Sequence, residues 1–344
     1  MDEGVPLHAA VRVALAAGHM SPRLCFLESS YEGAASAFEA YDAWGDLSDV
    51  LAGYEVERHA LVKATAVRDV CALAARPFDV FVNFCDGASD EERAGVEVVR
   101  ALEDLGVPFT GPTSGFYEPS RQAMKDACRA AGIDAPRGAI VRDADDLRAL
   151  DGLPYPLLVK HPSSYGSIGL SADSKVSTPE ALAAQVRHTV ARFGGALVEE
   201  FVAGREFSVL VVEGIGGDGP RALRAVEVLF AAGDEFAHFD LKWVRPHDLV
   251  AEPVLDDALD ARLRDLSRRF FTAMGGTGHA RCDFRMDAAG RLFMLEINPN
   301  CGVFLPAALA DSADVAMAHD PMGRRGFFDH LVQSAFNRCA AVAP

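Results

Sequence analysis

A short alternation of polar and apolar residues near the end of the chain constrains the fold more than any other segment. Residues 281–300 read RCDFRMDAAGRLFMLEINPN, with a Gly-containing turn in the middle, which is typical of a β-hairpin. Side chains two apart on a strand share a face, so Arg281 groups with Asp283, and Glu296 groups with Asn298. A turn of two or four residues places both pairs on one face, whereas a three-residue loop separates them. We expect the shared face.

Two carboxylates, an amide and an arginine on one face form a cluster of hard oxygen atoms beside a cation. Such oxygens suit Mg²⁺ that carries nucleotide phosphates. The alternative is an exposed edge hairpin whose acids are only solvated, and the hairpin alone does not separate the two interpretations.

Composition limits the classes of partner. The chain has 344 residues and a net charge of −17, which argues against nucleic acid or an anionic membrane as the main partner. Its seven cysteines contain no C-x-x-C pair, which favours neither a disulfide framework nor a zinc site and fits a reducing cytoplasm. The acidic N-terminus and the short apolar run 9–18, which contains Arg12, predict neither a signal peptide nor a membrane span.

The first third of the chain alternates strands and helices, the pattern of an α/β or α+β protein. We expect strands at 23–27, 78–85 and 106–111, helices at 60–76 and 90–105, and a helix or irregular extension at 6–20. In an open parallel sheet ligands lie beyond the carboxyl ends of the strands, which places loops 28–33 and 83–90 at that edge.

The rest of the chain, from residue 118 on, predicts strands that follow one another closely and are mostly antiparallel. Helices are expected at 118–131, 179–193 and 326–341, with strands at 139–141, 156–161, 170–176, 196–201, 206–213 and 221–230. Residues 231–253 have no regular pattern and are long enough for a lid, and 303–320 are expected to be irregular. A core-facing helical stripe follows the long loop: Leu259, Leu263, Leu266, Phe270 and Met274.

Two further segments carry polar groups at strand ends. An apolar strand ending at Lys160 runs into a Gly/Ser-rich loop whose backbone N–H groups could curl around phosphate oxygens. The segment 196–206 ends in a Gly turn and contains Glu199 and Glu206, which could accept hydrogen bonds from a nucleotide. Each segment alone also fits a solvated surface turn.

The polar residues occur in the order Lys125, Lys160, Gly/Ser loop, Glu199, Glu206, Lys242, Arg281, Asp283, Glu296, Asn298. This ordered set resembles the ATP-grasp superfamily, and most closely its D-alanine–D-alanine ligase branch, over about residues 78–306. The resemblance implies an N-terminal open parallel α/β domain (1–112), a central small α+β domain with a phosphate flap (113–197) and a C-terminal antiparallel sheet domain with the metal site (198–344).

The resemblance also implies roles for individual residues, with ATP and two Mg²⁺ ions (or Mn²⁺) bound together. The residues implied to contact ATP are Lys125 and Lys160 (phosphates), Gly166 and Ser167 (terminal phosphates), Glu199 with the backbone of Phe201 and Val202 (adenine), Glu206 (ribose) and Lys242, which reaches in from the long loop. The metal ligands would be Asp283, Glu296 and Asn298. The catalytic residues would be Arg281, which stabilises the tetrahedral centre, with Lys242 and Ser167.

The implied reaction is attack of a carboxylate on the γ-phosphate of ATP, followed by displacement of the acyl phosphate by an amine. An acyl phosphate hydrolyses if it is exposed, so residues 231–250 and the flap 163–170 are candidate lids. We expect small-molecule substrates, an amino acid plus a carboxylic acid, with no nucleic-acid or membrane partner, and we leave a homodimer open.

The substrate-specific parts depart from this branch. Asp86-Gly87 stands where the branch has His-Gly, and residues 301–305 (CGVFL) lack the hydroxyl of its substrate loop, which predicts a more apolar acceptor pocket. Joining an amino acid to a small non-peptide acid, as in the mycosporine-type branch, therefore fits better than D-alanine. The alternatives are a D-alanine–D-alanine ligase, an L-amino-acid or dipeptide ligase, and an inactive nucleotide-binding regulator. The retained Lys, Arg and acidic set argues against the inactive regulator.

Overall fold

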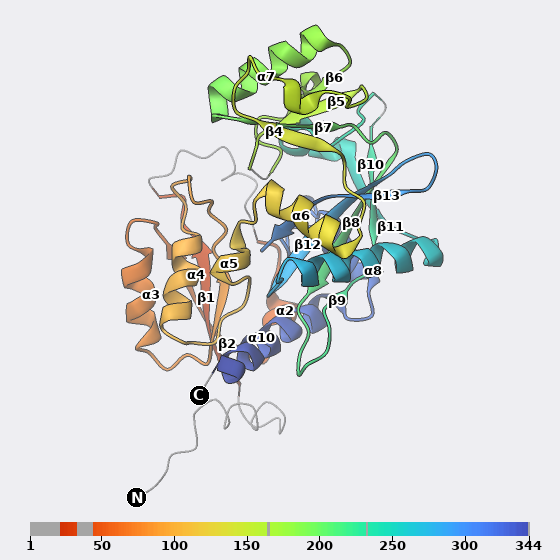
Figure 1. Ribbon diagram of the computed structural model, residues 1–344. Coiled ribbons are helices and arrows are strands. Elements are labelled where there is room, and N and C mark those ends of the chain that lie inside the picture. The colour runs from red at the N-terminus through yellow and green to blue at the C-terminus, as the bar shows by residue number, and fades with distance from the viewer. Residues whose placement is uncertain (1–20, 33–43, 164–165, 232, 343–344) are drawn as a thin grey trace, which may run out of the picture.

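Three sheets organise the molecule (Figure 1). The computed structural model describes residues 21–32, 44–163, 166–231 and 233–342. The predicted helix or extension at 6–20, part of the loop at 28–33 and two flap residues (164–165) therefore lie outside the described residues. Within the described ranges, no helix has the length and apolar content needed to cross a membrane.

The first sheet is parallel, with strand order β2-β1-β3. Its strands are β1 (Arg23–Ser29), β2 (Glu55–Leu61) and β3 (Val80–Phe84), accompanied by helices α2 (Ser48–Leu51), α3 (Ala66–Ala74), α4 (Val96–Asp104) and α5 (Ser114–Tyr117). Every residue of β3 is buried because both faces of the sheet are covered. The predicted open parallel sheet is confirmed. The predicted helix at 60–76 is wrong at its start, where β2 runs to Leu61, and residues 106–111 form only a single bridge, between Phe81 and Phe109.

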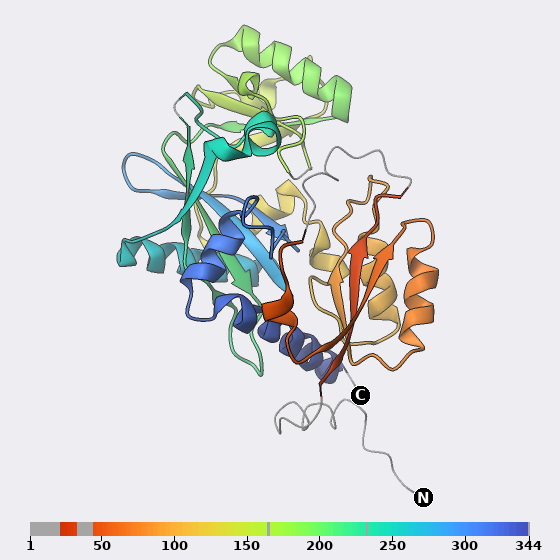
Figure 2. The same ribbon diagram turned by 180° about the vertical axis from the view of Figure 1, so that it is seen from behind.

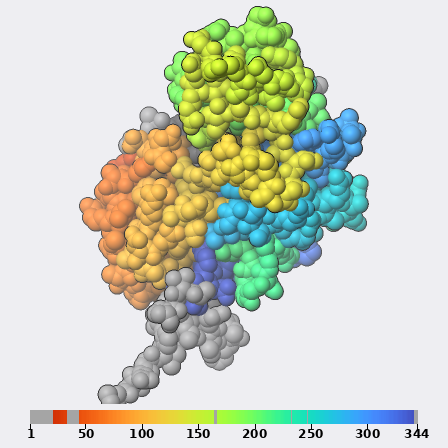
Figure 3. All heavy atoms as spheres, in the orientation of Figure 1, coloured from red at the N-terminus to blue at the C-terminus, as the bar shows by residue number. Residues whose placement is uncertain are grey.

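The second sheet is antiparallel and small, with strand order β4-β7-β5-β6. It contains β4 (Gly138–Val141), β5 (Leu157–Lys160), β6 (Lys175–Val176) and β7 (Ala196–Glu200), covered by α7 (Pro179–Phe193). It forms a lobe above the rest of the molecule (Figure 3). The predicted strand at 170–176 shrinks to β6, preceded by a 3₁₀ turn at 172–174. The proposed boundary at 197/198 falls inside β7, so sheet membership extends this lobe to Glu200.

The third sheet has six strands in the order β11-β10-β8-β12-β13, with β9 beside β8. The strands are β8 (Arg205–Val212), β9 (Arg221–Ala222), β10 (Val226–Phe230), β11 (Leu249–Pro253), β12 (His279–Met286) and β13 (Leu292–Pro299). Helices α6 (Arg121–Ala131) and α8 (Asp257–Ala273) pack on one face, where Phe207, Phe270 and Phe284 are fully buried. The stripe predicted for α8 is therefore core. The long segment 231–253 is not wholly irregular, because it contains a π-helical turn at 240–244 and ends in β11.

The last two helices join the first and third sheets (Figure 2). Helices α9 (Ser312–His319) and α10 (Gly323–Val342) share a core with β1, β3 and β8, and α9 corrects the prediction of an irregular 303–320. Val303 and Phe304 lie in this core, each 1% exposed. They are packing residues of this core, and the more apolar acceptor pocket stays a prediction.

Candidate active site

The hairpin of β12 and β13 brings the predicted metal set together. Arg281 pairs directly with Asn298, and Asp283 pairs directly with Glu296, so the four side chains share a face. The connecting loop, residues 287–291, has an odd length that would put the pairs on opposite faces, contrary to the turn of two or four residues expected for a shared face. A β-bulge at Leu295 adds one unpaired residue to β13 and restores the shared face.

Hydrogen bonds hold this polar face together. The Asp283 carboxylate accepts from Ser208 Oγ (2.7 Å), Arg281 Nε (2.9 Å) and Asn298 Nδ2 (2.9 Å). Asn298 Nδ2 also lies 3.3 Å from Glu296 Oε1. The same guanidinium of Arg281 donates to Asp311 Oδ2 (2.9 Å). The three predicted ligands therefore converge on one point of the sheet.

Glu296 is neutralised by a cation that sequence reasoning missed. Arg121, at the first position of α6, forms an ion pair with Glu296 and is itself buried. Burial opposes ionisation of Glu296, but Arg121, Lys160 and Arg281 outweigh it and lower its pKa to about 2. The sequence did contain a signal for this contact. Arg121 directly follows Ser120, the N-cap of α6, and stands four residues before Lys125.

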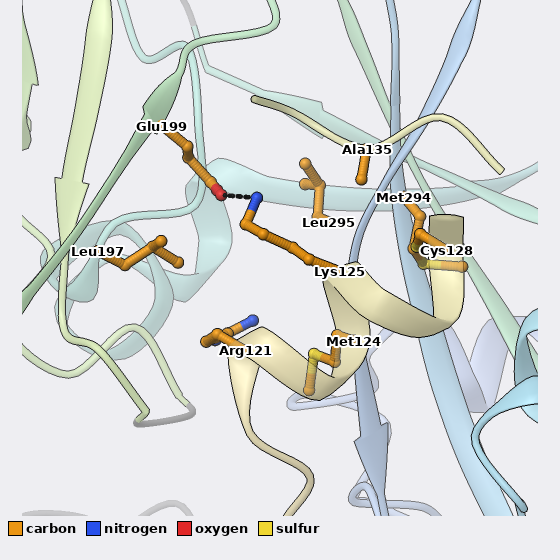
Figure 4. A pocket seen from close by; sticks show the side chains of 9 residues that line it. All are labelled: Arg121, Met124, Lys125, Cys128, Ala135, Leu197, Glu199, Met294 and Leu295. Carbon is orange, nitrogen blue, oxygen red and sulfur yellow. Dashed lines mark hydrogen bonds and ion pairs between the residues drawn. The ribbon is translucent and has the colours of Figure 1, made fainter. Parts of the chain in front are cut away.

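Glu199 joins the two predicted phosphate lysines. Lys125 Nζ lies 2.9 Å from Glu199 Oε2, and Lys160 forms an ion pair with the other carboxylate oxygen. Burial raises the pKa of Glu199, but the two lysines outweigh burial and lower it overall. Figure 4 shows Lys125 reaching across from α6 to Glu199 at the wall of a small pocket. The pocket is lined by Arg121, Met124, Lys125, Cys128, Ala135, Leu197, Glu199, Met294 and Leu295.

The predicted adenine and ribose residues continue from β7 into β8. The Phe201 and Val202 side chains are buried, and the Phe201 ring packs under the Arg285 guanidinium at 4.8 Å. Arg285 also approaches Glu206, with Nε 3.9 Å from Oε2. Burial, helped by Asp283 and Glu296, raises the pKa of Glu206 to about 7 despite Arg285.

The flap (163–170) and the long loop (231–250) contact each other. Ser167 Oγ donates to the Ala237 carbonyl (2.7 Å), and Trp243 Nε1 donates to the Gly166 carbonyl (2.7 Å). Gly166 and Ser167 both have left-handed backbones, with φ of 65° and 61°. The two predicted lids therefore form one cover.

Lys242 lies in the π-helical turn of this cover, residues 240–244. Burial lowers its pKa, and Arg281 lowers it further, against the opposing influence of Asp311, Asp283 and Glu296. The side chain is thus close enough to the polar face for its charges to interact. Cys301, by contrast, is a buried thiol whose pKa burial raises to about 12, as expected of a packing residue.

The donor set fits a hard divalent cation. The two carboxylates each lie within 3.3 Å of the Asn298 side-chain amide, and carboxylate and amide oxygens are the ligands that Mg²⁺ takes in proteins. In the described part of the chain no group of three or more His, Cys, Asp and Glu side chains forms a ready metal cluster. Instead, Arg281 forms an ion pair with Asp283, and Arg121 forms one with Glu296.

Comparison with known proteins agrees with this geometry. The family profile described as "D-ala D-ala ligase C-terminus" matches residues 138–313. Relatives named D-alanine–D-alanine ligase match most of the chain. The one from Laribacter hongkongensis is 30% identical over 260 residues, which is 74% of this chain and 79% of the relative. The one from Herminiimonas arsenicoxydans is 31% identical over 275 residues, which is 76% of this chain and 77% of the relative.

Solved structures show the same fold. A Bacillus anthracis D-alanine–D-alanine ligase complexed with ATP superposes with a TM-score of 0.66 at 17% identity, covering 94% of this chain and 99% of that one. The Coxiella burnetii D-alanine–D-alanine ligase gives 0.67 at 17% identity, covering 93% and 95%. The match of both sequence and fold decides the family: the chain belongs to the D-alanine–D-alanine ligase family and is an ATP-grasp ligase.

Proposed function

We propose that this ATP-dependent carboxylate–amine ligase activates a small carboxylic acid as an acyl phosphate and joins it to the amine of an amino acid. The observation that carries the proposal is the meeting of two carboxylates and an amide with several cations on one sheet face. Phosphoryl transfer needs little from a protein beyond positioning and charge neutralisation, and this face offers both.

The cations have separate tasks in this proposal. Arg121 and Lys160 bind the phosphates, because both already lie against acids of the site. Arg281 stabilises the negative charge of the tetrahedral centre that forms when the amine attacks. Lys242 neutralises charge on the transferring phosphoryl group from the cover, where its burial strengthens each electrostatic interaction.

Asp283, Glu296 and Asn298 would hold the divalent ions, which we propose to be two Mg²⁺. Bound there, the ions would neutralise the phosphate oxygens and orient the terminal phosphate. Phosphates entering the site would attract Arg121 and free Glu296 for the metal. Glu199 with the Phe201 and Val202 backbone would bind adenine, and Glu206 the ribose.

For Lys125 we propose a role other than the phosphate contact that the sequence predicted. Its ammonium bonds to Glu199 and to the Pro136 carbonyl (2.7 Å), whereas Arg121, one helical turn earlier, reaches Glu296. We therefore propose that Arg121 contacts phosphate and that Lys125 orients Glu199.

The cover would keep water from the acyl phosphate. Ser167 and Trp243 bind the flap to the long loop by side-chain hydrogen bonds, so opening either segment disturbs the other. Exclusion of water matters because an exposed acyl phosphate hydrolyses without forming the amide.

The metal set provides the first test. Glu296→Gln should abolish ADP formation in the presence of Mg²⁺ and amino acids, since it removes one charged oxygen ligand and keeps the shape. Ser48→Ala, at an exposed position at the start of α2, is a control. Normal turnover by the Glu296→Gln variant would refute the proposed metal site.

An amino-acid panel tests the substrates. The enzyme is incubated with ATP, Mg²⁺ and single or paired amino acids and small acids, and released ADP and the amide product are both measured. We expect little product with D-alanine alone, because Asp86 gives the acceptor edge a different charge. Efficient formation of D-alanyl-D-alanine would assign this chain the activity named for its relatives.

The seven cysteines are free thiols, which supports the proposal of a reducing, cytoplasmic setting. The homodimer stays a prediction, to be tested by sedimentation.

A further inference from the structure

The peptide bond between Cys85 and Asp86 is held from three directions. It lies just past the end of β3, at the edge of the first sheet where ligands bind in open parallel sheets. Its carbonyl accepts from Tyr117 OH (3.0 Å) and from Asn300 Nδ2 (3.2 Å). Its N–H donates to Ser29 Oγ (3.2 Å). These three contacts therefore fix the backbone position of Asp86, the second residue of this peptide bond.

The loop after this peptide is also built to be rigid. Arg93, whose side chain is 4% exposed, binds Asp86 (2.7 Å) and Glu91 (3.0 Å). Lys63 donates to the carbonyls of Ala88 (3.1 Å) and Ser89 (3.3 Å). The Asp86 carboxylate remains 40% exposed at the edge of the sheet.

Asn300 connects this edge to the metal face. It follows Asn298 with only Pro299 between them, and the proline ring restricts rotation in that link. Its backbone is left-handed, with φ of 50°, a conformation that Asn adopts more readily than most residues. Its N–H donates to the His279 carbonyl (3.0 Å), which fixes it to the start of β12.

We propose that Asn300 is a positioning residue that aligns the Asp86 edge of the first sheet with the metal face of β12 and β13. This inference rests on the proposed function and adds to it that the carboxylate substrate lies between the two. Asn300 acts through the Cys85 carbonyl at one end and through Asn298 at the other. Its task is to keep the substrate carboxylate in line with the terminal phosphate.

Loss of the Asn300 side-chain amide should disturb the alignment of the Asp86 edge with the metal face more than it disturbs folding. Tyr117 still bonds to the Cys85 carbonyl, so the carbonyl keeps a partner. A misplacement of about 1 Å between reacting groups can lower a rate by ~100-fold. The nucleotide half, on the other side of Asn298, keeps its own contacts.

The test compares Asn300→Gly with a matched control, Tyr117→Phe. Glycine tolerates the left-handed backbone, so the substitution removes the amide without adding strain. The control removes the hydroxyl that is shared between this carbonyl and the Gly87 carbonyl (3.0 Å each), and it leaves β13 untouched. Both variants are assayed with ATP, Mg²⁺ and the amino acids and acids of the panel, and ADP and amide are quantified separately.

For Asn300→Gly we expect kcat for amide formation to fall by about 10- to 100-fold, with the KM for ATP within about twofold of the wild type. Water should compete better for the terminal phosphate, so ADP should exceed amide. The control should keep the wild-type ratio of ADP to amide. A wild-type kcat and ratio in Asn300→Gly, or an equally large loss of ATP affinity, would overturn the inference.

Hydrogen exchange gives a readout that does not depend on turnover. Asn300→Gly should speed exchange of the amides at 86–88 and 301–302 together, because the two edges lose their link. Unchanged exchange at 86–88 would overturn the inference even in an active enzyme. Faster exchange combined with a wild type that turns over no panel compound would support Asn300 as the link and count against the proposed function alone.

Discussion

The clearest physical consequence of the site concerns Glu206, a buried acid whose pKa rises from its ordinary 4.5 to about 7. A carboxyl group with a raised folded-state pKa destabilises the fold when it ionises. The stability that protonated Glu206 contributes is complete below pH 4.5 and is lost as the pH rises to about 7. At pH 8 the ionised group should cost roughly 3 kcal/mol, and at pH 5 less than about 1 kcal/mol.

Glu206→Gln keeps the shape of the side chain and removes the charge. The variant should therefore gain about 2.5 kcal/mol relative to the wild type between pH 5 and pH 8. For a chain of this length, an unfolding entropy of ~2.1 cal/mol/K per residue converts this to a Tm difference of roughly 3 °C.

The assay is thermal unfolding of ligand-free wild type and variant at both pH values. Every other titrating group is common to both proteins, so the change in their Tm difference isolates Glu206. The reasoning is refuted if the Tm difference between the two proteins is the same at pH 5 and pH 8. A variant that loses stability specifically at pH 8 would show that Arg285 pairs with ionised Glu206 strongly enough to overcome burial.

Three further variants test other parts of the molecule. Lys160→Ala should raise the KM for ATP and lower kcat, because one cation serves both bound phosphate and transition state; steady-state kinetics at wild-type values would refute its phosphate contact and leave only its ion pair with Glu199. Trp243→Phe removes the 2.7 Å bond to Gly166, worth about 1 kcal/mol, so ADP should exceed amide by a few-fold more than in the wild type, measured by parallel ADP and product assays. Phe270→Ala opens a cavity in the core between α8 and the third sheet and should lower the free energy of unfolding by about 3–5 kcal/mol with little change in the KM for ATP. Thermal unfolding and steady-state kinetics would check this.

Local periodicity determined much of the architecture. The alternation in residues 281–300 predicted the hairpin, and the stripe on α8 predicted its buried face, because both depend on neighbouring residues in the chain. Lys160 at a strand end before a Gly/Ser loop was predictable for the same reason. Strands β2 and β11 were missed, since their polar and apolar residues fit a helix or a loop equally well before their partners are known.

Tertiary structure alone decided which side chains meet. The run Phe293-Met294-Leu295 broke the alternation, but only the pairing of β12 with β13 shows that Leu295 bulges and turns Glu296 toward Asp283. Arg121 and Lys125 are both cations on one helix, and only packing of α6 against β13 separates a partner of Glu296 from a partner of Glu199. Sequence gives the type of each group and its spacing along one element; contacts between elements far apart in the chain depend on register and packing, which no local pattern encodes.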